Sequence, residues 1–266
     1  MVDYPVRTEV HIRQADRGRD GAVSTVGLAR CLEDARLRIR MRRFEQLVLA
    51  GGFEPFQILL VSQAVDRLAP VGPRAHDVEV HTGVQRIGRS SFTYGQAVFH
   101  RGERVGSAEA TVVLAGAGGP LPLPGELLAD LGDLRLPEQP PMPRPDAERH
   151  RRGSYAHHYP LRARIGDVDS NQHVNYLALV TWYDEAVAAF TAEALGGVPD
   201  LPPLSYRIQY TGEVTYPGDY EIGLSVRGSG TDQVAYRLAV FRGGTALGVA
   251  DAVGPRGELP DSALED

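Results

Sequence analysis

The sequence contains no lysine, because all 28 of its basic residues are arginine. Schiff-base catalysis and the phosphate-binding P-loop both use a lysine, so both are excluded. The single cysteine, Cys31, allows neither an internal disulfide nor a cysteine-rich zinc site, and a reducing cytoplasm is the expected location. No apolar run approaches the roughly 18–20 residues that cross a bilayer, and the N-terminus lacks the apolar segment of a signal peptide.

Several motifs are also missing. Neither G-x-S-x-G, G-x-G-x-x-G nor G-x-x-x-x-G-K occurs, which excludes the serine-hydrolase elbow and the usual nucleotide-binding loops. The 34 acidic residues outnumber the 28 basic ones, and the net charge of −6 has the wrong sign for a surface that embraces nucleic acid. The pair His157-His158 has no matching ligand cluster, so we assign it to linker chemistry and predict no metal and no cofactor.

The 266-residue sequence contains an internal repeat. The segment YGQAVFHRG at 94–102 matches YRLAVFRGG at 236–244, and the match extends without gaps over 93–110 and 235–252 at an offset of 142. Upstream, residues 32–35 match 183–186 at an offset of 151, and residues 4–7 match 159–162 at an offset of 155. These steps predict a tandem duplication with two loop deletions in the second copy.

A proline-rich stretch separates the two copies. Residues 116–153 contain eight prolines, which indicates an extended linker with a short helix around 127–131. We therefore expect an N-terminal unit at 1–115, a Pro/Gly-rich linker at 116–153, a C-terminal unit at 154–254 and a loose tail at 255–266.

Each copy is predicted to contain a first strand, a turn, one long helix and then several strands. In the second copy, residues 176–195 are apolar almost all round, which predicts a helix enclosed by other elements. Strands are predicted at 204–210, 220–227, 234–241 and 246–253, with a hairpin at Gly243-Gly244. The first copy's helix is expected to run from about Val23 to Leu49. One helix packed against a curved antiparallel sheet per copy gives an α+β fold.

The first helix carries six arginines, at 30, 36, 38, 40, 42 and 43. The guanidinium groups from Arg36 to Arg43 could bind the phosphates of pantetheine or a nucleotide, but a solvated face is the favoured interpretation. Cys31 lies at helical spacing from Leu28, Leu32 and Ala35, which predicts a buried side chain and not a nucleophile.

The sharpest signal is DVDSNQHVNY at 167–176, where a strand ends and the apolar helix begins. Asp169, Asn171, His173 and Asn175 alternate there. At a helix N-terminus, unpaired amides can polarise a carbonyl oxygen, a carboxylate can activate water or attack directly, and a histidine can orient the acyl group or water. The alternative is a structural role, because Asp and Asn are favoured in turns and at helix N-caps. For Asn171 or Asn175 taken alone, capping and a direct catalytic role have about equal support.

The same stretch resembles the D-x-D-x-N-Q-H-V-N-N motif of plant-type acyl-ACP thioesterases. It is also similar, more loosely, to the D-x-D-x-x-G-H-V signature of 4-hydroxybenzoyl-CoA thioesterase-like hotdog proteins. Residues 206–210 (YRIQY) and 216–219 (YPGD) extend the resemblance. Two positions depart from it, because Gln209-Tyr210 stands where the plant family has Glu-Cys and Tyr176 replaces the second Asn.

With the duplication, this resemblance implies a double hotdog, that is, two tandem hotdog units, each a long helix wrapped by a curved antiparallel sheet. It implies that Asp169 is the nucleophile or general base, that Asn171 and His173 complete the polar set, and that amides near Tyr176 polarise the carbonyl. Asn175, Tyr176 and Gln209 are the expected substrate contacts, and Asp167 is expected to be structural. No residue is expected to bind a metal.

The first copy lacks these groups. At an offset of 151, Gly18, Asp20, Ala22 and Ser24 stand where the second copy has Asp169, Asn171, His173 and Asn175. We therefore expect one site per chain, with the first unit forming a wall of the acyl pocket. Only Asp20 could restore a second site.

The resulting hypothesis is a cytoplasmic thioesterase that hydrolyses acyl-CoA or acyl-ACP to a free acid and a thiol. It would act without nucleic acid or a membrane span, as a monomeric double hotdog or a homodimer. A hotdog hydratase or dehydratase on acyl thioesters is one alternative. A non-catalytic module that binds acyl thioesters, in which the polar cluster only caps a helix, is the other.

Overall fold

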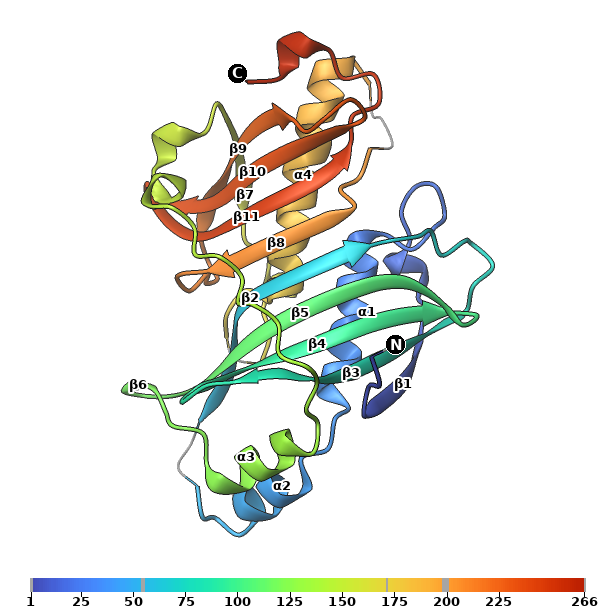
Figure 1. The fold of residues 1–266 in the computed structure, drawn as a ribbon. Coiled ribbons are helices and arrows are strands. Elements are labelled where there is room, and N and C mark those ends of the chain that lie inside the picture. Colours follow the sequence, from blue (N-terminus) through green and yellow to red (C-terminus); the bar gives the residue numbers. More distant parts are fainter. Residues whose placement is uncertain (1, 54–55, 171, 198–200, 266) are drawn as a thin grey trace. The chain divides into compact units, whose positions relative to one another are not determined.

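The computed structural model describes residues 2–53, 56–170, 172–197 and 201–265. They divide into two compact units. The first unit comprises residues 1–23 and 27–142, and the second comprises 24–26 and 143–266. In each unit, one long helix lies across one face of an antiparallel sheet (Figure 1).

The first unit has its sheet in the order β1-β3-β4-β5-β2, with β6 added to β5. Its strands are β1 (Val6–His11), β2 (Gln57–Arg67), β3 (Asp77–Ile87), β4 (Ser91–His100), β5 (Glu103–Gly116) and β6 (Gly119–Pro120). Its helices are α1 (Thr25–Leu37), which belongs to this unit from Gly27 onward, α2 (Arg42–Leu49) and α3 (Gly125–Gly132).

The second unit repeats this plan with the order β7-β9-β10-β11-β8. Its strands are β7 (His157–Arg162), β8 (Ser205–Tyr210), β9 (Asp219–Gly228), β10 (Gln233–Arg242) and β11 (Thr245–Pro255). The long helix is α4 (Tyr176–Leu195). Strands β8 to β11 agree with the four predicted ranges to within two residues, and α4 has the predicted bounds.

Helix α4 forms the centre of the second unit's core. Its buried residues include Trp182, Tyr183 and Phe190, which pack with inward-facing residues of the sheet such as Tyr206 and Tyr236. The helix begins where the Asn175 side chain accepts a hydrogen bond from the Leu177 N–H, and it ends at Gly196, whose φ of 65° is the left-handed C-terminal conformation. Apolar residues on all sides thus mark an enclosed helix, as predicted.

The single helix predicted for 23–49 is wrong, because two helices occupy this segment. Helix α1 ends at Leu37 and α2 starts at Arg42. Between them, Ile39 and Met41 pack on the buried cluster that contains Phe44 of α2 and Leu127 of α3. The chain bends because burying these side chains against the distant helix α3 outweighs the propensity to continue one helix.

The two sheets have the same register. Gln96 of β4 pairs with Ala108, and Leu238 of β10 pairs with Ala250, so the offset of 142 holds residue by residue. For the first strands the predicted offset of 155 is wrong. His11 pairs with Asp77 and Arg162 pairs with Asp219, which aligns β1 with β7 at 151. The similarity of YPVR and YPLR is local, whereas strand pairing with β3 and β9 sets the register.

The linker contacts the sheets at several separate points. In the first unit, β6 pairs with β5, and the Leu136 N–H donates to the Val84 carbonyl at 2.8 Å. In the second unit, Arg149 is buried, with Nη1 2.6 Å from Asp251 Oδ1 and Nη2 2.7 Å from the Ala250 carbonyl. His157-His158 belongs to β7 and not to the linker; the His157 ring lies edge-on to Phe190.

Candidate active site

The polar motif forms a short hairpin that leads into α4. A bridge between Val168 and Val174 closes the hairpin, and the Asn175 N–H donates to the Asp167 carbonyl at 2.7 Å. The Asp167 side chain is buried, and its Oδ2 accepts from the Arg164 N–H at 2.9 Å. This carboxylate therefore stabilises the turn before the hairpin, in agreement with the structural role expected for it.

Asp169 and His173 lie opposite each other on this hairpin. The Asp169 N–H donates to the His173 carbonyl at 2.9 Å, directly beyond the Val168–Val174 bridge. Residues opposite each other on two antiparallel segments have neighbouring side chains. The backbone hydrogen bond fixes the positions of the two residues. Their side chains are half-buried and therefore remain accessible. Asn171 lies outside the described residues.

Asn175 and Tyr176 form the start of α4. The Asn175 Oδ1 accepts a hydrogen bond from the Leu177 N–H at 2.7 Å. This oxygen therefore caps the helix, which is the alternative role considered for Asn175. Tyr176 is the first residue of the helix and is half-buried. The positive end of the helix dipole and the first-turn N–H groups therefore lie beside the hairpin that carries Asp169 and His173.

Gln209 lies on β8, where the alternation of the strand separates it from this junction. Tyr206 and Ile208 are buried in the core with α4, and their neighbours Arg207 and Gln209 therefore project to the opposite face of the sheet. There the Gln209 Nε2 donates to the linker carbonyl of Pro143 at 2.5 Å. A role for Gln209 in substrate binding stays a prediction.

One charged neighbour was not predicted from the sequence. Glu213, in the turn after β8, has its Oε2 3.3 Å from the Nε2 of His173. The backbone brings the two together, since His173 bridges to Thr215 and the Val174 N–H donates to the Val214 carbonyl at 2.7 Å. The motif itself contains no signal for this contact, because it depends on pairing between segments about 40 residues apart.

The first unit repeats the hairpin without its chemistry. The Gly18 N–H donates to the Ala22 carbonyl at 2.8 Å, and Arg17 bridges to Val23, as Val168 does to Val174. Gly21 has a φ of 78° and its counterpart Gln172 has a φ of 64°. The Asp20 Oδ1 accepts from the Ala22 N–H at 2.9 Å, so this carboxylate serves its own turn.

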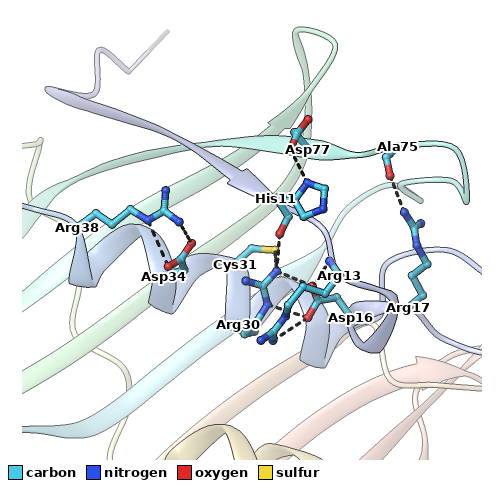
Figure 2. Close-up of polar contacts among 10 residues, drawn as sticks. All are labelled: His11, Arg13, Asp16, Arg17, Arg30, Cys31, Asp34, Arg38, Ala75 and Asp77. Atoms are coloured by element: carbon cyan, nitrogen blue, oxygen red, sulfur yellow. Dashed lines mark hydrogen bonds and ion pairs between the residues drawn. The ribbon is translucent and has the colours of Figure 1, made fainter.

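Five of the six arginines between residues 30 and 43 have side-chain partners within their unit. Arg38 pairs with Asp34, Arg40 with Glu45 and Arg43 with Asp130 and Asp133, while Arg36 donates to the Gln96 side chain. Arg30 binds the buried carboxylate of Asp16 (Figure 2). These contacts agree with the favoured interpretation of the arginines and not with a phosphate site.

Cys31 is wholly buried in α1, as predicted. Burial raises the pKa of its thiol to about 11. A thiol in this state is a poor nucleophile at neutral pH. Within the described part of the chain, no group of three or more His, Cys, Asp or Glu side chains is arranged to hold a metal ion. Among the described helices, none combines the length and apolar character needed to cross a membrane.

The fold is shared with solved thioesterase structures. A protein from Lactobacillus plantarum assigned as an oleoyl thioesterase is 14% identical, with a TM-score of 0.74 and coverage of 95% of each chain. The 12:0-ACP thioesterase from Umbellularia californica is 17% identical, with a TM-score of 0.73 and coverage of 94% of this chain and 97% of the other. An acyl-ACP thioesterase from Bacteroides thetaiotaomicron is 14% identical, with a TM-score of 0.70 and the same coverage.

These similarities confirm the predicted double-hotdog fold. No protein-family model matches the sequence, and no curated protein matches it.

Proposed function

We propose that this protein hydrolyses an acyl thioester, carried by CoA or by acyl carrier protein, to a carboxylic acid and a thiol. The observation that carries the proposal is the pair Asp169 and His173, fixed opposite each other by the backbone beside the N-terminus of α4. The equivalent hairpin of the first unit has Gly18 and Ala22 at these positions, so we propose one site per chain. The activities named for the three structural neighbours fit this reaction.

The start of α4 supplies electrostatic stabilisation. A thioester carbonyl placed there accepts hydrogen bonds from first-turn N–H groups, and the positive end of the helix dipole favours the oxygen as it becomes negative. Because the Leu177 N–H is already bound by Asn175 Oδ1, other N–H groups of that turn, near Tyr176, have this role. Tyr176 also contributes to the wall of the site.

Asp169 supplies the negative group that starts the reaction. As a general base it takes a proton from water, whose oxygen attacks the carbonyl carbon. As a nucleophile its carboxylate attacks directly and forms a mixed anhydride, which water then hydrolyses. In both routes the C–S bond breaks and the thiolate leaves with its electron pair. His173 and Asn171 orient the acyl group or water.

A single turnover in water enriched in ¹⁸O detects a mixed anhydride that is hydrolysed at its Asp169 carbonyl. With enzyme in excess, direct attack by water places the label in the released acid. A mixed anhydride hydrolysed at its Asp169 carbonyl leaves the label in the protein, where mass spectrometry of the peptide containing Asp169 detects it.

Thiol release from a panel of acyl-CoA and acyl-ACP substrates of different chain lengths tests the proposal. The wild-type protein is expected to release free thiol, and Asp169→Asn is expected to lower kcat by about a hundredfold or more, the usual contribution of a positioned base. Asp219→Asn is the matched control, because Asp219 lies in the same unit with its side chain 87% exposed. Full activity of Asp169→Asn would exclude the assigned role.

The same panel distinguishes the two alternative functions. Formation of enoyl absorbance without thiol release would identify a hydratase or dehydratase. Tight binding of acyl-CoA without turnover would identify a binding module. The buried, single cysteine fits a reducing compartment, and we place the activity in the cytoplasm, in a monomer or homodimer.

A further inference from the structure

We propose that Glu213 is the positioning residue for His173 and that it acts on turnover through this imidazole. The inference rests on the proposed function and adds a residue to the same site. Glu213 Oε2 lies 3.3 Å from His173 Nε2, and Glu213 lies outside the DVDSNQHVNY motif of residues 167–176. A carboxylate at this distance restricts the orientation of the imidazole ring.

The backbone places Glu213 as firmly as it places the motif. Residues 173–174 run antiparallel to 214–215, with a bridge between His173 and Thr215 and a 2.7 Å hydrogen bond from the Val174 N–H to the Val214 carbonyl. The Thr215 N–H and carbonyl are both bound by the Tyr220 hydroxyl, at 2.9 and 2.7 Å. Tyr220 is itself buried, so the turn that presents Glu213 is anchored in the core.

The first unit provides an internal comparison. There the Val23 N–H donates to the Val71 carbonyl at 2.9 Å, which is the equivalent of the bond from Val174 to Val214. When these two hydrogen bonds are aligned, the preceding residues also align, so Ala22 corresponds to His173 and Pro70 corresponds to Glu213. The hairpin that lacks the histidine therefore also lacks the carboxylate, although both copies keep the backbone contact.

The contact contributes little to stability, which separates its role from a structural one. The Glu213 side chain is 69% exposed and that of His173 is 25% exposed. Ion pairs with so exposed a partner are screened by water and contribute little to folding. Removing the carboxylate is therefore expected to leave the melting temperature unchanged and to affect kcat.

Gln209 stands where the plant-type acyl-ACP thioesterase motif has a glutamate. Its side chain lies on the face of β8 opposite the core and binds the linker. Glu213 is thus a carboxylate of this chain at a different position, four residues further along.

The test compares Glu213→Ala and Glu213→Gln with Glu185→Ala and Glu185→Gln, which change an exposed glutamate on α4 of the same unit. Glu213→Ala is expected to lower kcat about tenfold or more, with KM changed less than twofold, the scale at which removing a group that orients a ligand or base acts. Glu213→Gln is expected to lie between Glu213→Ala and wild type, because the amide keeps the size and polarity of the side chain but not its charge. The Glu185 variants are expected to match wild type.

A double-mutant cycle shows whether Glu213 acts through His173. In a His173→Asn background, Glu213→Ala is expected to cause no further loss of kcat. Should His173→Asn be too slow to measure, the ¹⁵N signals of the His173 ring give a second readout, expected to change in Glu213→Gln and not in Glu185→Gln.

An unchanged kcat in Glu213→Ala, equal losses in both backgrounds, or unchanged ring signals would overturn the inference while the proposed function stands. A wild-type protein that releases no thiol from any substrate would overturn the proposed function, and this inference with it.

Discussion

Arg30 binds both carboxylate oxygens of Asp16 in the first unit, with Nε 2.7 Å from Oδ1 and Nη2 2.5 Å from Oδ2 (Figure 2). The Asp16 side chain is 3% exposed and that of Arg30 is 14% exposed. In the second unit the residue equivalent to Arg30 is Thr181, and the matching carboxylate, Asp167, is bound by Arg164. Both copies bind this carboxylate with the arginine three residues before it, Arg13 or Arg164, and the first unit adds Arg30.

We predict that Arg30→Thr, which installs the second unit's residue, destabilises the protein by roughly 3–5 kcal/mol. The variant leaves the buried Asp16 carboxylate with Arg13, whose side chain is 58% exposed, as its remaining charged partner, and breaking a buried pair costs about this much. Urea unfolding at pH 7 measures the change. Asp34→Asn is the control on the same helix, because its i,i+4 pair with the half-exposed Arg38 is worth less than about 0.5 kcal/mol. Equal effects of the two changes would contradict the prediction.

The same pair predicts a dependence on pH. Burial pushes the pKa of Asp16 upward, but hydrogen bonds from Arg30 and Arg13 outweigh it and hold the pKa below its ordinary value. The stability from this group is therefore present above the unfolded pKa of about 3.9 and is lost as the pH falls through the folded pKa. The free energy of unfolding should fall below about pH 4 in wild type and fall less steeply in Asp16→Asn.

Cys31 is expected to resist thiol reagents in the folded protein. With the thiol wholly buried and its pKa raised to about 11 by burial, only about one thiol in a thousand is ionised at pH 8. Ellman's reagent should therefore label no thiol in the native state and one per chain in guanidinium chloride. Alkylating reagents should leave turnover unchanged. Rapid labelling of the native protein would contradict this placement.

Asn175 allows capping to be separated from substrate binding. Asn175→Ala removes the side-chain oxygen that binds the Leu177 N–H and should cost about 1 kcal/mol, whereas Asn175→Ser keeps a capping oxygen and should stay close to wild type. Thermal melts and KM are measured for both variants. For a capping role we expect Asn175→Ser to keep both. Wild-type stability with a raised KM would instead show that the amide contacts the substrate.

Local signals were sufficient to predict α4 and the strands of the second unit. Helix α4 has a capping residue, Asn175, at its start and Gly196 at its end, and its hydrophobic residues are buried by neighbours in the same unit. The hairpin at Gly243-Gly244 has positive φ values of 56° and 84°, a conformation that favours glycine. Such features depend on adjacent residues and are visible in the sequence.

Features that depend on distant contacts were not predicted. The end of α1 depends on burial of Ile39 and Met41 beside α3, which lies more than 80 residues away. The register of β1 depends on pairing with β3. Of the candidate site, Asp169 and His173 were predicted as one polar set and lie opposite each other, whereas Glu213 reaches His173 only through pairing of two chain segments.

The linker is expected to stabilise the second unit through Arg149. Its buried guanidinium binds Asp251 and the Ala250 carbonyl, and its own carbonyl accepts from the Tyr155 hydroxyl at 2.7 Å. Arg149→Ala leaves the Ala250 carbonyl without this donor and should cost about 2 kcal/mol, the range for hydrogen bonds to charged groups. Arg149→Lys should recover only part of this, because an ammonium cannot bind both oxygens as the planar fork does.

Asp251→Asn separates charge from hydrogen bonding in this contact. The Asp251 side chain is 55% exposed, so losing its charge should change stability by less than about 1 kcal/mol. Limited proteolysis with trypsin gives a second measurement, since Arg149→Ala should speed cleavage at the linker residues Arg151 and Arg152, and Asp251→Asn should not. If the linker were a free connector, all three variants would match wild type in unfolding, and cleavage at these arginines would be equally fast in each.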